Sequence, residues 1–516
     1  MEQRSTHSPD FILGIDLSSL TQGIPIRGRV GETDALMVKS GDQIFVVGAL
    51  CSHYQAPLGE GLIVDEEVRC PWHHARFSLR TGEALCAPAF DAIKAWNVVV
   101  EDGKAFVRER VKNQPTQPLT QENHPKNIVI VGAGGAGFSA AFTLRNKGYQ
   151  GSIDIISADG SLPYDRPNLS KDYLAGNASL EWLPLRSPDW YKKNNVSIRL
   201  NTRATKLEPS EKKLTFSDGD SLTYGRLLLA TGAEPIRLNT PGAEFAHVFY
   251  LRSLADCNAI IDFSKNATRA LVIGASFIGL EVAAALKTRG LDVHVVAPES
   301  VPMARILGPE IGDFILKLHQ QHGVVFHLED VVTEIDTRTV KLKSGKSLEA
   351  DFIVIGVGVK PNLLLAEEAG LKIDKGVVVD SFLQTSDKDI YAAGDIARWP
   401  DKISGQNIRV EHWAVAERHG QIAAQNMLGA NIPFDAPPFF WSQHYDQTIS
   451  YVGNAPIWNR HEMSGNPDSG NCAVTYFMDN HKLAVATIGR DLQNLCAELA
   501  FEKELEKQEI GLNNIG

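Results

Sequence analysis

The glycine-rich stretch at residues 127–137 constrains the fold of this 516-residue chain more than any other feature. An apolar run there predicts a buried strand, and Gly132, Gly134 and Gly137 follow it at the spacing of a tight turn that lets a phosphate approach the backbone. A helix starting near Gly135 would direct its unpaired N–H groups at that anion. The stretch predicts an α/β dinucleotide-binding fold, although an ordinary glycine-rich turn could have a similar sequence.

Length and charge set the broad class of the protein. A chain of 516 residues is too long for one hydrophobic core and predicts about three or four domains. Apolar residues make up 43%, and 62 acidic against 51 basic side chains give a net charge of -11. These values predict a soluble globular protein and argue against nucleic acid as a partner.

The sequence also predicts a cytoplasmic protein. The first ten residues lack the apolar segment of a secretory signal, and six scattered cysteines do not form a disulfide framework, which fits a reducing compartment. The most apolar long segment, residues 270–286, is interrupted by Glu281 and two glycines, so we expect no membrane span. A homodimer is one possible assembly.

Residues 10–109 predict a small all-β domain. Short strand-like runs are separated by Gly-Asp, Gly-Glu and Asp-Gly turns. The runs are residues 35–39, 43–49, 96–100 and 105–107.

Two short loops of this domain carry cysteine and histidine. They are Cys51-x-His53 and Cys70-x-x-His73. Facing one another across a β scaffold, two such loops can hold a metal centre, and the simplest alternatives are an iron–sulfur cluster and a structural zinc ion with two Cys and two His ligands.

The loop sequences "CSHYQAPLGEG" and "CPWHHARFSLRTGEALCAP" resemble those of soluble ferredoxin-type Rieske domains. The resemblance implies a 2Fe-2S cluster with Cys51 and Cys70 on one iron and His53 and His73 on the other. Because Cys and His alternate within the loops, we favour this cluster over zinc, and His74 is not expected to be a ligand.

Residues 110–125 have no hydrophobic periodicity and contain three prolines, so they predict a linker. In an extended polyproline-like state residues 111–125 could span about 45 Å, at about 3.1 Å per residue. Such a linker would let the cluster domain dock on a neighbour or swing away.

From residue 126 onward, strands, glycine-rich turns and helices alternate, which predicts α/β domains. The second strand, residues 152–157, is followed by Ala158 where an acidic residue would bind the adenosine ribose. The carboxylate appears one place later, at Asp159, which is a candidate substitute.

Three further segments, "LPYDRPNLSK" at residues 162–171, "LLATGAEP" at 228–235 and "YAAGDIA" at 391–397, resemble flavoproteins with two dinucleotide-binding domains. They are similar to the branch that contains the ferredoxin reductases and the apoptosis-inducing factors. The resemblance implies that the first nucleotide is FAD.

The same resemblance implies roles for single residues. Arg166 would meet the phosphate or adenosine part of FAD, Lys171 would lie near the reactive edge of the flavin, and Asp395 would accept hydrogen bonds from the ribityl hydroxyls. The turn at Thr231 and Gly232 would contact the same cofactor. In isolation, each charged residue could equally be a solvated charge or a turn former.

A second strand-turn-helix motif starts at residue 270 and carries Gly274, Ser276 and Gly279. Because it lies inside the sequence of the first nucleotide domain, we predict a second, inserted domain that binds NADH or NADPH. Ser276 replaces the middle glycine and would crowd the phosphate. By resemblance, Glu281 would reach the nicotinamide pocket and pair with Lys171.

The choice between NADH and NADPH rests on the next strand, residues 292–297. It ends at Ala297 where an NAD enzyme usually has an acid, yet no arginine cluster follows to bind a 2′-phosphate. The sequence therefore favours NADH and leaves NADPH open. The turn at Gly358 would complete the nicotinamide site.

The last part of the chain predicts a helix through residue 426 and then a small α+β domain. If the helix begins at the flavin, its dipole would favour negative charge there, and Trp413 and Trp441 are candidate aromatic walls. The acidic tail after Glu502 is expected to be solvated.

The sequence argues against two other kinds of redox enzyme because it lacks the residues that they need. No cysteine occurs between residues 159 and 200, which argues against a disulfide reductase. The nearest approach to the iron triad of an oxygenase is His319-x-x-His322, which is more typical of a helix surface or partly buried packing.

The predicted architecture is multidomain: an all-β Rieske domain, two Rossmann-like α/β domains with one inserted in the other, and a C-terminal α+β domain. The predicted boundaries are 10–109, 110–125 for the linker, 126–250 and 379–437 for FAD, 251–378 for NAD(P), and 438–516. The predicted function is an NAD(P)H-dependent FAD oxidoreductase that passes electrons to the fused 2Fe-2S cluster and on to an external acceptor. A redox sensor and an NADH oxidase are the alternatives.

Overall fold

The structure, a computed structural model, describes residues 8–112 and 124–513, without the side chains of residues 506–513. Contacts divide it into two compact units. The first unit combines the N-terminal region with the chain from Arg490 onward, and the second extends to Gly489. Most of the predicted linker, residues 113–123, lies outside the described residues.

The first unit contains the predicted all-β domain. A six-stranded antiparallel sheet has the order β1 (Ile15–Asp16), β10 (Lys104–Arg110), β9 (Ala95–Glu101), β4 (Gln43–Gly48), β3 (Thr33–Ser40) and β2 (Ile26–Val30). A second sheet has the order β5 (Leu62–Val64), β6 (Glu67–Arg69), β7 (Arg76–Ser78) and β8 (Ala84–Cys86).

Strand β3 is buried on both faces because successive side chains point to opposite sides of the sheet. Ala35 and Met37 pack into one hydrophobic cluster. Leu36 and Val38 pack into another, which also contains Cys51 and Cys70. Strand β3 therefore lies between the hydrophobic cluster that contains Cys51 and Cys70 and the other cluster of this domain.

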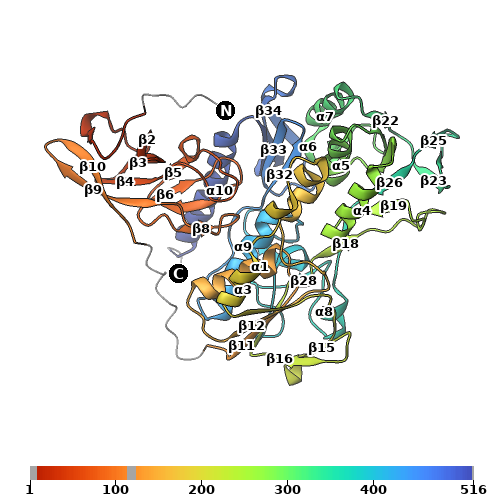
Figure 1. Ribbon diagram of the computed structural model, residues 1–516, viewed down its shortest axis with the longest axis horizontal. Coiled ribbons are helices and arrows are strands. Elements are labelled where there is room, and N and C mark those ends of the chain that lie inside the picture. The colour runs from red at the N-terminus through yellow and green to blue at the C-terminus, as the bar shows by residue number, and fades with distance from the viewer. Residues whose placement is uncertain (1–7, 113–123, 514–516) are drawn as a thin grey trace. The chain divides into compact units, whose positions relative to one another are not determined.

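Helix α10 (Asp491–Asn513) completes the first unit. Figure 1 shows it beside β6 and β8, and it contacts β5. The sequence assigned residues 438–516 to one C-terminal domain, but the structure groups this helix with the N-terminal sheets. The reason is its buried face, whose members recur every three or four residues: Asn494, Leu495, Glu498, Phe501 and Leu505.

The second unit contains two parallel sheets. The first has the order β13 (Val196–Arg199), β12 (Ser152–Ile156), β11 (Asn127–Val131), β17 (Arg226–Leu229) and β29 (Ile390–Ala392). The second has the order β19 (Val248–Tyr250), β26 (Phe352–Ile355), β20 (Arg269–Ile273), β21 (Asp292–Val296) and β22 (Val325–His327).

The strand order confirms the predicted fold class, because the second sheet is formed by chain that lies between β17 and β29 of the first. The boundary expected at residue 250 differs slightly, since β19 already pairs with β26. The helices of this unit are α1 (Gly135–Asn146), α2 (Asp172–Ala175), α3 (Pro188–Lys193), α4 (Leu254–Ser264), α5 (Phe277–Thr288), α6 (Ala304–Leu307), α7 (Pro309–Gln321), α8 (Leu364–Glu368) and α9 (Trp413–Met427).

An antiparallel sheet follows α9 and packs against α5 through its first strand. Its order is β32 (Phe439–His444), β33 (Gln447–Gly453), β36 (His481–Ile488), β35 (Asn471–Met478) and β34 (Arg460–Asn466). The remaining strands form small sheets: β14 (Ala204–Glu208), β15 (Lys213–Phe216) and β16 (Ser221–Thr223); β18 (Ala233–Pro235) and β27 (Val359–Pro361); β23 (Val332–Ile335), β24 (Thr339–Leu342) and β25 (Ser347–Glu349); β28 (Val377–Val378), β30 (Ala397–Asp401) and β31 (Gln406–Ile408).

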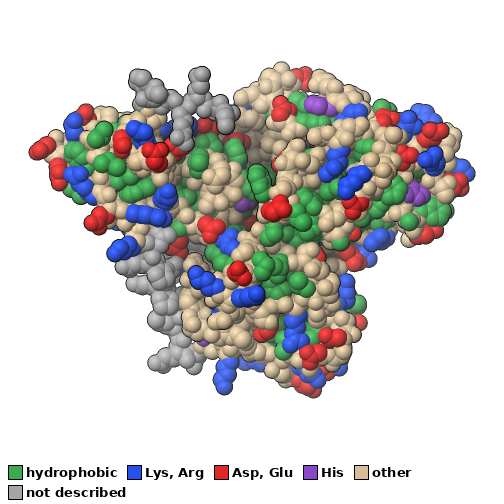
Figure 2. Space-filling model, in the orientation of Figure 1, with side chains coloured by type: hydrophobic (Ala, Val, Ile, Leu, Met, Phe, Trp, Pro, Cys, Tyr) green, Lys and Arg blue, Asp and Glu red, His purple; other side chains and the backbone are tan. Residues whose placement is uncertain are grey.

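Acidic and basic side chains are interspersed over the face shown in Figure 2. Within the described part of the chain, no helix combines the length and hydrophobicity needed to cross a membrane.

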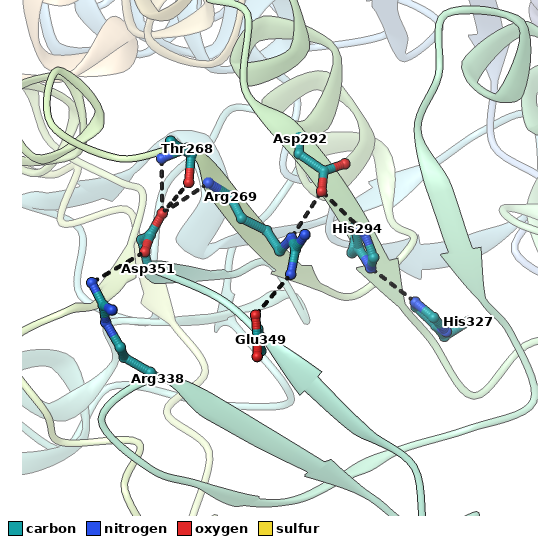
Figure 3. Close-up of polar contacts among 8 residues, drawn as sticks. All are labelled: Thr268, Arg269, Asp292, His294, His327, Arg338, Glu349 and Asp351. Atoms are coloured by element: carbon teal, nitrogen blue, oxygen red, sulfur yellow. Dashed lines mark hydrogen bonds and ion pairs between the residues drawn. The ribbon is translucent and has the colours of Figure 1, made fainter.

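A polar network joins the amino-terminal ends of the strands in the second parallel sheet (Figure 3). The Asp351 carboxylate accepts hydrogen bonds of 2.8 and 3.0 Å from the backbone N–H groups of Thr268 and Arg269. The Arg269 guanidinium binds Asp292 at 2.8 Å. Nucleotides bind at the opposite, carboxyl ends of such strands, so we assign this network to stability.

We predict that Asp351→Ala lowers stability without changing NADH oxidation. The N–H groups of Thr268 and Arg269 hold the pKa of Asp351 below its usual value. Its stabilisation is therefore complete above the unfolded pKa near 4 and is lost as the pH falls through the lower folded pKa. Thermal melting at pH 7 should show a loss of about 1–2 kcal/mol, and an equal loss at every pH down to 3 would contradict this assignment.

Candidate functional site

A cavity of about 580 Å³ lies in the second unit, where the N-termini of three helices meet. Gly134 and Gly135 line it at the start of α1, Ser276 and Phe277 at the start of α5, and Trp413 at the start of α9. Unpaired N–H groups and helix dipoles at these ends favour anionic ligands.

The first turn leaves no room for side chains. Gly132 has a φ of +111°, and an added Cβ would collide with the carbonyl oxygen of Ala230. A Cβ on Gly137 would collide with the carbonyl oxygen of Gly132. The turn and the first turn of α1 therefore pack backbone against backbone, which leaves Gly134 exposed to the cavity as a phosphate cradle.

Arg166 lies beside this cradle. Its guanidinium nitrogen Nη1 is 3.5 Å from the place where a Cβ on Gly134 would stand, and its Nε has no hydrogen-bond partner among the described residues. Burial, and then the neighbouring charge of Arg252, lower the pKa of Arg166. A partly buried guanidinium with unused donors fits the pyrophosphate of FAD.

The second turn, after β20, repeats the arrangement. Gly274 has a φ of +108°, and a Cβ on Gly279 would collide with the Gly274 carbonyl oxygen. Ser276 does not simply crowd the site: its hydroxyl donates to the Gly356 carbonyl oxygen at 2.7 Å and accepts from the Gly279 N–H at 3.3 Å. The serine thus caps α5 while lining the cavity.

Lys171 and Glu281 form an ion pair in the cavity wall. Lys171 Nζ lies 2.9 Å from Glu281 Oε2, and the two side chains are 11% and 4% exposed. Glu281 also accepts hydrogen bonds of 2.6 Å from the hydroxyls of Ser170 and Ser442. Three donors therefore compensate the burial of this carboxylate.

The hydrogen bonds continue away from the cavity through two buried imidazoles. Ser442 Oγ is 3.1 Å from His444 Nε2, and His444 Nδ1 is 3.2 Å from His319 Nε2. Burial lowers the pKa of His444 to about 3 and that of His319 well below its usual value, so both rings are neutral. Because Ser442 donates to Glu281, each ring must donate through Nε2 toward the carboxylate. His319 is thus buried, not on a helix surface.

We predict that Glu281→Gln slows reduction of the bound flavin by NADH. The amide cannot balance the Lys171 charge, and loss of one charge-assisted bond, about 1.5–3 kcal/mol, corresponds to roughly a 10- to 100-fold lower rate. Rapid mixing with NADH, followed at the flavin absorbance, measures the rate. Glu334→Gln, at an exposed pair with Lys341, is the matched control, and equal rates in both variants would show that the Glu281 charge has no role.

Asp395 lines the cavity in an ion pair that the sequence did not reveal. Its Oδ2 lies 2.7 Å from Arg252 Nη2, and Arg252 also lines the cavity. Arg252 follows β19 and belongs to no recognisable motif. Arg305 and Arg409 are two further lining arginines without a sequence signal.

The remaining predicted residues divide into two groups. Gly232, Gly358, Trp413 and Trp441 line the cavity. Thr231 is instead bonded to the Asn362 carbonyl oxygen at 2.8 Å.

Asp159 is not among the lining residues. Its carboxylate accepts hydrogen bonds from the Tyr164 hydroxyl at 2.7 Å and from the Ser161 N–H at 3.0 Å. These local bonds use one acceptor site on each carboxylate oxygen.

The predicted metal ligands lie together in the first unit. Cys51 and Cys70 are each 1% exposed. Their thiols contact one another. This contact and burial raise the pKa of Cys51, whereas the same contact lowers the pKa of Cys70 against the opposing effect of burial. His53 Nδ1 lies 3.2 Å from His73 Nδ1. Burial lowers the pKa of His53 to about 3, which leaves its ring neutral and able to bind a metal.

This donor set fits two irons better than one zinc ion. Among the described residues, no three His, Cys, Asp or Glu side chains converge on a point that could hold a single ion. The four donors form a thiol pair and an imidazole pair, whereas a structural zinc ion needs four donors around one centre. In a Rieske cluster the two Cys and two His ligands bind different irons.

His74 does not join this set. Its side chain is fully buried, and its Nδ1 lies 3.0 Å from Glu498 Oε2 on α10. The sequence predicted that His74 is not a ligand, and nothing in it indicated the contact with Glu498.

Comparisons with known proteins match both units. Residues 126–420 match the family model of the pyridine nucleotide-disulphide oxidoreductases, and residues 14–97 match that of the Rieske [2Fe-2S] domain. The chain is 30% identical over 505 residues to apoptosis-inducing factor 3 of Homo sapiens, covering 94% of this chain and 83% of that protein. It is 36% identical over 366 residues to rubredoxin-NAD(+) reductase of Pseudomonas putida, covering 70% and 95%.

Among solved structures, the covalent putidaredoxin reductase-putidaredoxin complex matches with a TM-score of 0.70 and 32% identity, over 73% of this chain and 93% of that chain. The matched ranges contain both candidate phosphate cradles and all four candidate Cys and His ligands. The protein uses FAD, NAD(P)H and a 2Fe-2S cluster. The chain belongs to the pyridine nucleotide-disulphide oxidoreductase family and is an NAD(P)H-dependent flavoprotein oxidoreductase with an N-terminal Rieske domain.

Proposed function

We propose that this protein oxidises NAD(P)H and delivers the electrons singly, through its own Rieske cluster, to an external acceptor. The observation that carries the proposal is the combination, in one chain, of a cavity with two nucleotide cradles and a separate site with two buried thiols and two imidazoles. When bound, FAD accepts two electrons as a hydride and can release them one at a time. The cluster carries one electron at a time.

The cysteines support this route over disulfide chemistry. None of the six forms a disulfide in the described part of the chain, and none of them lines the cavity. A disulfide reductase needs a cysteine pair at the flavin. Mostly buried cysteines without disulfides also fit a reducing compartment, so we place the protein in the cytoplasm.

The residues of the cavity have separate tasks in this proposal. Arg166 and the N-terminus of α1 bind the FAD pyrophosphate, and the N-terminus of α9 stabilises negative charge on the flavin ring. Lys171, fixed by Glu281, orients the reacting edge. Ser276 and Gly279 hold the nicotinamide nucleotide, and we propose NADH because no arginine cluster follows β21.

The relatives support a separate acceptor. Rubredoxin-NAD(+) reductase is named for rubredoxin, and putidaredoxin reductase forms a complex with putidaredoxin. Here the iron–sulfur domain is part of the chain, so we propose that the acceptor takes electrons from the Rieske domain.

Steady-state turnover with a one-electron acceptor tests the proposal. We expect sustained NADH-dependent reduction of cytochrome c with little oxygen uptake. Negligible turnover together with an NADH-dependent change in oligomeric size would instead identify a redox sensor, as the similarity to apoptosis-inducing factor 3 allows. Oxygen uptake that persists without the cluster would identify an NADH oxidase.

A further inference from the structure

The C-terminal helix α10 carries two acidic residues toward the segment that holds two of the cluster ligands. Glu498 is fully buried, and the Glu502 side chain is 16% exposed. An acidic helix at the end of a chain is ordinarily solvated, and burying a carboxylate is costly unless charges and hydrogen bonds compensate it.

The compensation comes from residues immediately around the ligands. Glu498 Oε2 lies 3.0 Å from His74 Nδ1 and 3.9 Å from Arg69 Nη1. Glu502 Oε2 lies 2.8 Å from Arg69 Nη2, and Glu502 also pairs with Arg76. Two carboxylates thus balance two guanidinium groups in a largely buried network.

The partners of the two glutamates lie close to two cluster ligands along the chain. Arg69 directly precedes Cys70, and His74 directly follows His73. His74 has a φ of +60°, a backbone conformation that L residues seldom adopt without support from their surroundings. The helix therefore holds the loop of residues 69–76 on both sides of its two ligands.

We propose that α10 is a positioning element of the cluster site, in which Glu498 acts through His74, and Glu502 acts through Arg69 and Arg76. The ion pairs of the two glutamates are with residues that flank the ligands along the chain. Their role is to fix the direction from which Cys70 and His73 reach the cluster, as outer-shell partners do at other metal sites. The range that matches the Rieske family model ends at residue 97, so this element lies outside it.

A consequence concerns the linker. Strand β36 ends at Ile488 and α10 begins at Asp491, so two residues connect α10 to the second unit. The first unit is therefore joined to the second through two chain connections, the predicted linker and this short one.

The test compares Glu498→Gln with Glu504→Gln in the full-length holoprotein. Both substitutions remove one charge from α10, but Glu504 is exposed. For Glu498→Gln we expect altered Rieske EPR g-values, a shifted cluster midpoint potential, and cluster loss to a chelator that is roughly tenfold faster. Flavin content should equal that of the control.

Glu502→Gln covers the case in which Glu498→Gln does not fold, because the Glu502 side chain is partly exposed. The same changes, smaller in size, are expected for it. The proposal is overturned if the variants that fold match Glu504→Gln in EPR, potential and cluster loss. A lower melting temperature with an unchanged EPR spectrum and potential would also overturn it, because that result indicates a purely structural helix.

Discussion

Replacing His73 with alanine is expected to abolish the Rieske EPR signal while NADH-dependent reduction of a dye continues. His73 supplies one of the two converging imidazoles, and its loss leaves an iron with one protein nitrogen ligand. The dye takes electrons from the flavin, whose cavity lies in the other unit. EPR of the dithionite-reduced protein and a dye assay make the measurement.

His247→Ala is the control for this variant, since His247 lies in the second unit and contacts the Asp336 carbonyl oxygen. His247→Ala should retain both the Rieske EPR signal and dye reduction. Reduction of cytochrome c, if it depends on the cluster, should fall in His73→Ala to the rate set by direct transfer from the flavin. Simultaneous loss of dye reduction and EPR signal in His73→Ala would contradict the separation of the two sites.

The complementary variant, Gly137→Ala, is expected to lose FAD and keep the cluster. Its Cβ would collide with the carbonyl oxygen of Gly132, so α1 must move away from the turn that cradles the pyrophosphate. Overpacking of about 1–3 kcal/mol corresponds to flavin binding that is weaker by roughly 10- to 100-fold. Flavin per chain, from absorbance after gel filtration, measures the effect.

The same substitution at Gly48 provides the control, because an added Cβ there would have its nearest neighbour at 3.5 Å. Gly137→Ala should retain the Rieske EPR signal, which also shows that the chain has folded. Full flavin content in Gly137→Ala would mean that the turn is not the FAD cradle.

Features that lie close together in the sequence could be predicted from it. The two cradles follow from glycines within a few residues of a buried strand, and the cluster ligands follow from two short Cys/His loops. The insertion of one nucleotide domain in the other also followed from motif order, and the strand order confirms it. In each case the local chemistry permits few residue types.

The features that could not be predicted depend on contacts between distant segments. Glu498 meets His74, and Arg252 meets Asp395, although neither Glu498 nor Arg252 belongs to a motif. His319 was expected on a helix surface or in partly buried packing. Its contact with His444 on β32 arises only from packing of the C-terminal sheet. Such pairs depend on tertiary topology, which spacing within one segment does not encode.

The central claim is that electrons from NADH pass through the flavin to the fused cluster. An anaerobic titration of the purified protein with NADH, followed by visible absorbance and EPR, tests it most directly. We predict that the flavin absorbance bleaches and that the EPR signal of the reduced Rieske cluster appears in the same titration. A flavin that is fully reduced while the cluster stays oxidised would contradict the claim.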